Sequence, residues 1–177
     1  TLALVVQSYA VATGWDARGK HFHALYLFQL MGLNGAFLTG DLFNLFVFFE
    51  VLLIASYGLM VHGSGRDRLR AGIQYVAFNL IASTLFLFAL GLVYAVTGTL
   101  NMADMAVRLA TLGDNTAVQA GFAFVVVGLG VKAAIFPLHG WLPGAYAGAP
   151  SLVSVFLAAT ATKTAIYLIA RFTFDVF

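Results

Sequence analysis

Long apolar runs separated by short polar links dominate this chain. The run Leu42 to Met60 is nineteen residues long and carries one charge, Glu50, near its middle. About 20 apolar residues in a helix cross the roughly 30 Å hydrocarbon core of a bilayer. Regular alternation of polar and apolar residues, the pattern of membrane β-strands, is absent. The pattern therefore predicts an all-α, polytopic transmembrane helix bundle.

The apolar runs form a single membrane domain, expected over residues 1–177. The chain begins without methionine inside an apolar run, so we expect an internal piece of a longer membrane protein. Pro137 follows the fifth run; because proline lacks an N–H and clashes with the preceding turn, that helix is expected to break there. The runs predict five full spans and one partial span: 1–12 (partial), 22–39, 42–62, 71–97, 117–136 with a break at 137, and 151–171.

The polar links predict the orientation in the membrane. Links 13–21, 63–70 and 137–150 lie on one side and carry five Lys or Arg residues, against two on the other side when Arg171 is included. Cytoplasmic loops carry an excess of Lys and Arg. The first set of links is therefore expected in the cytoplasm.

Two links also contain helix-start signals. Asp41 follows a glycine in a tight turn and is expected to act as a cap or turn residue. Asn101, followed by Asp104, resembles a helix start and predicts a short surface helix in the link 98–115.

Composition supports lipid as the main solvent. Only 9% of the residues are charged and 62% are hydrophobic, whereas soluble domains carry about 25% charged residues. A net charge of +2 is too small and scattered to indicate nucleic-acid binding, and the absence of cysteine excludes disulfides, Cys-ligated zinc and iron–sulfur clusters. No phosphate-binding loop, nucleophile motif or metal cluster is present, so we expect no metal, no cofactor and no conventional soluble active site.

Three lone ionisable residues lie inside apolar runs. An ionised side chain at this depth costs about 2.5–3.5 kcal/mol, and such residues usually mark an ion or proton pathway. Glu50 has only apolar helical neighbours, Lys132 lies five residues before Pro137, and Lys163 lies near the centre of its run. Two structural alternatives stay open: Glu50 could be permanently protonated, and Lys132 could reach the membrane surface through its flexible side chain.

Several polar residues could complete such a pathway. His139 is a candidate because histidine is the side chain suited to exchanging protons near physiological pH, although it could equally be a structural hydrogen-bonding residue. Tyr75, Asn79 and Ser83 fall at i, i+4 and i+8 on one helix face. Thr160 and Tyr167 share a face with Lys163. The expected proton pathway comprises Glu50, Lys132, Lys163 and His139, with Asn79, Ser83, Thr160 and Tyr167 as possible lining of a hydrated path or as polar contacts between helices.

The sequence resembles a known family over nearly its whole length. The strings that carry the resemblance are NGAFLTGDLFNLFVFFEVLLIASYGL (34–59), GTLNMADMA (98–106), VKAAIFPLHGWLP (131–143) and AYAGAPSLVSVFLAATATKTAIYLIAR (145–171). They are similar to the antiporter-like membrane subunits shared by respiratory complex I and the Mrp-type multisubunit Na⁺/H⁺ antiporters, and especially to the D-type subunits of the latter. Gly144 stands where quinone-reductase relatives often carry an acid, which favours the Mrp branch.

This resemblance implies a fragment, roughly helices 3 to 8, of a larger antiporter-like fold. It implies that Glu50 pairs with Lys132 on a broken helix, that Lys163 continues the relay, and that His139 lies nearby. The implied function is a proton-translocating subunit of a bacterial plasma-membrane Na⁺/H⁺ antiporter, a transporter rather than an enzyme, with other membrane subunits as partners. Two alternatives remain: a non-redox proton-pumping subunit of an NADH:quinone oxidoreductase or membrane hydrogenase, and a structural membrane scaffold.

Overall fold

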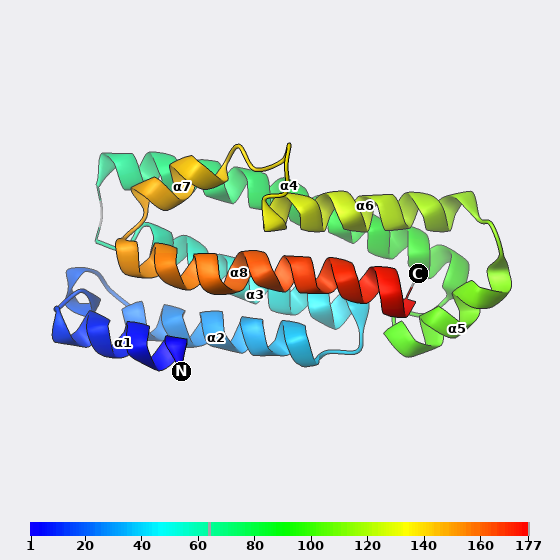
Figure 1. The fold of residues 1–177 in the computed structure, drawn as a ribbon, viewed down its shortest axis with the longest axis horizontal. Coiled ribbons are helices and arrows are strands. Elements are labelled where there is room, and N and C mark those ends of the chain that lie inside the picture. Colours follow the sequence, from blue (N-terminus) through cyan, green and yellow to red (C-terminus); the bar gives the residue numbers. More distant parts are fainter. Residues whose placement is uncertain (64, 177) are drawn as a thin grey trace.

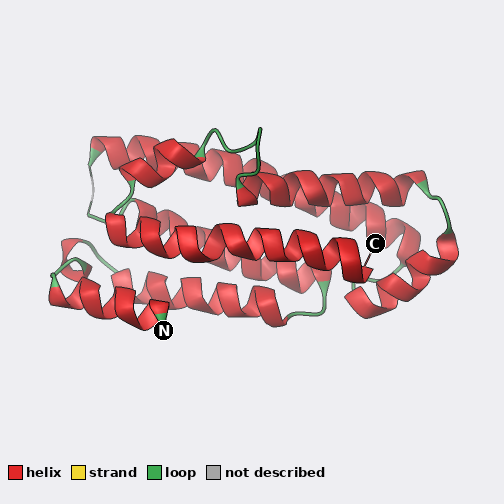
Figure 2. Cartoon of the chain, in the orientation of Figure 1, coloured by secondary structure: helices red, strands yellow, loops and turns green. Residues whose placement is uncertain are grey.

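The computed structural model describes residues 1–63 and 65–176, and helices account for all regular structure in that range apart from one isolated β-bridge. Figure 2 shows helices and connecting loops, so the expected all-α class is confirmed for the described part of the chain. The elements are α1 Leu2–Ala12, η1 Asp16–Arg18, α2 Phe22–Leu38, α3 Leu42–Met60, α4 Arg66–Thr97, α5 Met102–Leu112, α6 Thr116–Ala133, α7 Leu142–Gly148, α8 Ser151–Arg171 and the π-helical turn η2 Phe172–Val176.

Four helices are long and apolar enough to cross a membrane: α3, α4, α6 and α8 with its η2 extension. The helix α2, one of the five full spans expected, has 17 residues and is shorter than these four. The helix α4 begins at Arg66 instead of residue 71, because the charged residues of the preceding link form its first turns. Asp67 in that first turn favours the start through its interaction with the helix dipole.

The long helices run side by side along one axis of the molecule (Figure 1). The helix α2 packs against α3, α4 packs against α6, and α8 contacts helices of both pairs. Close approach of α2 and α3 depends on Gly32, where a Cβ atom would lie 2.7 Å from the backbone nitrogen of Leu52. Gly35 likewise abuts the ring of Phe48. Small residues at these two positions thus allow α2 and α3 to approach closely.

The turns at one end of the bundle are joined by backbone hydrogen bonds. Leu42 N donates to Leu100 O at 2.8 Å, and Met102 N donates to Gly40 O at 2.8 Å. Asp41 caps α3 by accepting from the backbone nitrogen of Asn44, as expected. Asn101 caps α5 through the backbone nitrogens of Ala103 and Asp104, which confirms the predicted helix start. A hydrogen bond from Arg108 lowers the pKa of the Asp104 carboxyl.

The helix that carries Lys132 is interrupted inside the bundle. The helix α6 ends at Ala133, and Ala134 adopts a left-handed conformation with φ of 54°. The chain therefore leaves the helix three residues before Pro137, whose ring could not continue it. After a short loop, α7 runs in the remaining space beside α4 and α8 (Figure 1).

Candidate functional site

Lys132 lies in the last turn of α6 with its ammonium group inside the bundle. The residue is only 6% exposed, and Nζ donates a hydrogen bond to Ser83 Oγ at 2.9 Å. The same Nζ lies 5.2 Å from the centroid of the Phe49 ring, a cation–π contact. The side chain therefore does not extend to the membrane surface, which was the structural alternative for this residue.

A small cavity adjoins Lys132, with room for about one water molecule. Polar groups from several helices reach it, and aromatic and aliphatic side chains close it. Its lining residues besides Lys132 are Phe49, Leu52, Leu53, Tyr75, Asn79, Trp141, Tyr146, Ala161 and Thr162. The cavity thus places polar side chains of α4, α7 and α8 beside Lys132.

The polar line on α4 faces the interior. Tyr75, Asn79 and Ser83 are all buried. Asn79 Nδ2 donates to Tyr75 O at 2.9 Å, and the Tyr75 hydroxyl shares a 3.0 Å hydrogen bond with Ser56 Oγ on α3. The i, i+4, i+8 spacing thus brings three polar side chains onto the buried face of α4, with Ser83 as the direct partner of Lys132.

Glu50 is half-buried in α3, one position after the Phe49 ring that contacts Lys132. Its Oε1 atom is buried and has no hydrogen-bond partner among the described residues. The carboxylate and the Lys132 ammonium interact electrostatically, but they form none of the ion pairs within 4.0 Å found in the described part of the chain. The structure thus brings the two groups near one another without direct contact.

Lys163 lies on a different face of α8 from the one that borders this cavity. Its side chain is exposed, and Nζ donates to the backbone carbonyl of Ala158 at 2.7 Å. Tyr167 is 40% exposed and its ring contacts Phe37, whereas the Thr160 hydroxyl donates to Phe156 O at 2.8 Å. Lys163 is therefore not brought together with Lys132 in the described residues.

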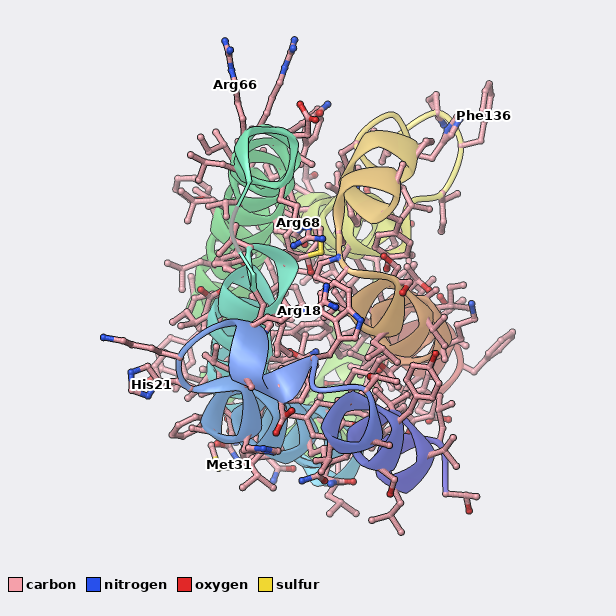
Figure 3. All side chains as sticks on the ribbon, turned by 90° about the vertical axis from the view of Figure 1, so that its left-hand side faces the viewer. Arg18, His21, Met31, Arg66, Arg68 and Phe136 are labelled. Atoms are coloured by element: carbon pink, nitrogen blue, oxygen red, sulfur yellow. The ribbon has the colours of Figure 1, made fainter. Side chains whose placement is uncertain are left out.

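His139 lies in the loop between α6 and α7. Its ring packs at a tilt against Phe136, with 5.5 Å between centroids. Figure 3 shows Phe136 projecting away from the bundle. Trp141, by contrast, is buried, and its Nε1 donates to Val131 O at 2.9 Å, which anchors the loop beside Lys132. The loop thus contributes Trp141 to the cavity, while His139 remains outside.

Sequence reasoning missed some polar groups of the interior. Thr162 lines the Lys132 cavity although it directly precedes Lys163, and Tyr146 reaches the cavity from α7. Gln29 is fully buried in α2, and neither its Nε2 nor its Oε1 has a hydrogen-bond partner among the described residues. The available signal was a polar side chain inside a mostly apolar run, which Gln29 shares with Glu50. The described residues contain no group of three or more His, Cys, Asp or Glu side chains placed to hold a metal ion.

A buried lysine at a helix break, surrounded by membrane-length helices, is typical of membrane subunits that move ions. Residues 39–177 match the family model described as "NADH:quinone oxidoreductase/Mrp antiporter, TM". The chain belongs to this family, and the expected resemblance is confirmed.

The chain is similar to two D-type antiporter subunits and to a chain in a solved Mrp complex. It is 54% identical over 173 residues to the probable D-type subunit of a K⁺/H⁺ antiporter from Rhizobium meliloti (strain 1021), covering 96% of this chain and 32% of the relative. It is 42% identical over 171 residues to the D-type subunit of a Na⁺/H⁺ antiporter from Bacillus subtilis (strain 168), covering 96% and 35%. The Mrp complex structure from Dietzia sp. DQ12-45-1b matches with a TM-score of 0.87 and 42% identity, covering 96% of this chain and 32% of that chain. The chain spans about a third of the length of these relatives.

Proposed function

We propose that this chain forms part of the proton-translocating subunit of a multisubunit monovalent cation/H⁺ antiporter in a bacterial plasma membrane. The observation that carries the proposal is the buried ammonium of Lys132 at the break of α6. It donates to Ser83, lies beside a small polar cavity, and interacts electrostatically with Glu50. A lysine in such a setting can gain and lose a proton, whereas a lysine at the lipid surface would stay charged.

Glu50 acts in this proposal as the movable partner of Lys132. Two unit charges 4 Å apart interact by about 4 kcal/mol at an effective dielectric constant of roughly 20. Closing the pair would hold the proton on Lys132, and opening it would favour release of the proton into the adjoining cavity. The unpartnered Oε1 atom of Glu50 supports this role, because a buried carboxylate oxygen that lacks a fixed donor is free to change partner.

Lys163 would receive the proton on the outer face of α8. Its side chain is exposed in the described residues, and an exposed ammonium on a membrane-length helix needs water or protein around it. The remaining two thirds of a full-length relative can supply that surrounding surface. Other membrane subunits would complete the assembly, as the Mrp complex structure suggests for its own subunit.

The relatives support both K⁺ and Na⁺ as the counter-transported cation. A respiratory proton pump is the second candidate function, because the family description includes NADH:quinone oxidoreductase membrane subunits. Both candidates use the same proton pathway. They differ in what drives it: a cation gradient in the antiporter, and redox chemistry in partner subunits of the pump.

The test uses the complete subunit in its assembled complex, in everted membrane vesicles that report pH changes on addition of Na⁺ or K⁺. Lys132→Gln removes the buried charge and keeps a polar side chain, and we expect a loss of proton movement of at least about a hundredfold. Lys20→Gln is the matched control, because Lys20 is exposed in the link before α2. Normal cation-driven pH changes in the assembled Lys132→Gln complex would overturn the proposal.

A further inference from the structure

The helix α8 separates the two lysines of the proposed pathway. Lys132 lines the cavity on the inner face of this helix, together with Thr162 of α8 itself. Lys163, the residue that follows Thr162 along the chain, is exposed on an outer face. A proton that leaves Lys132 for Lys163 must therefore pass through the wall that α8 forms.

One backbone carbonyl connects the two faces of this wall. The hydroxyl of Thr162 donates to Ala158 O at 3.2 Å, and Nζ of Lys163 donates to the same Ala158 O at 2.7 Å. The carbonyl has two lone pairs and can accept both hydrogen bonds. Since both donors lie within hydrogen-bonding distance of one atom, a single water molecule can span the space between the Thr162 hydroxyl and the Lys163 amine.

Thr162 is suited to transfer because a hydroxyl both donates and accepts hydrogen bonds. The other residue of α8 at the cavity, Ala161, has no polar side-chain atom. The neighbouring threonines of α8 also bond to their own helix backbone, Thr160 to Phe156 O and Thr164 to Thr160 O, but neither lines the cavity. Thr162 is thus the polar side chain of α8 that borders the Lys132 cavity and shares an acceptor with Lys163.

We propose that Thr162 passes protons across α8 between the two lysines, an inference that rests on the proposed function. The Lys132 ammonium gives a proton to a water molecule in the cavity, and that water protonates the Thr162 oxygen. Thr162 releases its original hydroxyl proton toward a water molecule beside Ala158 O, from which a neutral Lys163 amine takes it. The net change is one proton moved from Lys132 to Lys163, and the hydroxyl is restored with its new hydrogen.

Three variants of the complete subunit test this role in the assembled complex. Thr162→Val keeps the shape and removes the hydroxyl, and we expect the initial rate of cation-driven proton movement to fall about tenfold or more. Thr162→Ser keeps the hydroxyl and is expected to restore most of the rate. Thr164→Val is the matched control, because Thr164 is buried in the same helix with the same type of backbone hydrogen bond, and its rate is expected to stay near that of the unaltered complex.

A solvent isotope measurement distinguishes loss of proton transfer through Thr162 from a packing defect caused by the substitution. With Thr162→Val the remaining transport is expected to show a larger rate decrease in D₂O than the unaltered complex, because proton transfer has become the slow step. If the Val variant does not assemble, Thr162→Ala replaces it, since the smaller side chain cannot clash. Equal loss in Thr162→Val and Thr162→Ser, or an unaltered rate in Thr162→Val, would overturn the inference while Lys132→Gln still abolishes transport. Full transport in Lys132→Gln would instead overturn the proposed function itself.

Discussion

At the residue scale, Glu50 provides the sharpest test of the charge at the centre of the bundle. Its carboxylate interacts electrostatically with Lys132 and keeps one buried oxygen without a partner among the described residues. Glu50→Gln keeps the size and removes the charge, so the ammonium loses the anion proposed to regulate it. We expect cation-driven pH changes in everted vesicles to fall about tenfold or more.

The control for this experiment is Asp114→Asn, which makes the same chemical change at an exposed carboxylate in the link before α6. That variant is expected to transport normally. Undiminished transport by an assembled Glu50→Gln complex would show that the carboxylate serves only structure, as a permanently protonated residue would.

The sequence singled out Glu50 and Lys132 as candidates because a lone charge inside an apolar run is visible without coordinates. It could not identify Ser83 as the partner of Lys132, because the two residues are 49 positions apart and meet only through packing of α4 on α6. The sequence also could not predict that the Lys163 side chain is exposed. Polar residues occur at four of five consecutive positions there, from Thr160 to Thr164, so the pattern does not single out one buried face.

At the scale of elements, close contact between α2 and α3 requires a residue without a side chain at position 32, which is Gly32. A Cβ atom at Gly32 would lie 2.7 Å from Leu52 N and 2.8 Å from Phe48 O, which are backbone atoms that cannot move aside alone. We expect Gly32→Ala to lower the stability of the subunit by about 1–3 kcal/mol through overpacking. The measurement is the thermal unfolding midpoint of the purified complex in detergent.

Gly91→Ala serves as the comparison for that experiment. Gly91 is exposed in α4 and a Cβ atom there meets nothing within 4 Å, so alanine is expected to be neutral or to stabilise the helix by about 0.5–1 kcal/mol. A midpoint for Gly32→Ala equal to or above that of Gly91→Ala would contradict the close-packing account.

Elements were predicted well where local chemistry determines them. Asp41 and Asn101 cap their helices with their own side chains, and such signals are readable in sequence. The end of α6 was harder to predict from the sequence. Pro137 indicated a break, but the left-handed conformation of Ala134 moves it to the residue after Ala133. Alanine carries no local preference for that conformation, so tertiary packing of the loop, with Trp141 anchored to Val131, determines where the helix ends.

At the scale of the whole molecule, the links divide between two ends of the bundle, as Figure 1 shows. Links α1–α2, α3–α4 and α7–α8 lie at one end, while α5 and the α2–α3 turn lie at the other. Basic residues concentrate at the first end. Arg18 lies 4.2 Å and Arg68 5.4 Å from the Trp15 ring centroid, and both turn toward the bundle, whereas Arg66 points outward (Figure 3). At the other end, Arg108 and Arg171 donate to the carbonyls of Thr97 and Thr39.

This asymmetry predicts that the Arg66 end faces the cytoplasm, because Lys and Arg in short links are retained on that side during insertion. The described chain has no cysteine, so single cysteines can report the orientation in a complete subunit freed of any others. A membrane-impermeant thiol reagent is expected to label Arg66→Cys in everted vesicles and Thr111→Cys in intact cells. Both positions are exposed, so access depends on sidedness alone, and the reverse labelling pattern would invert the topology.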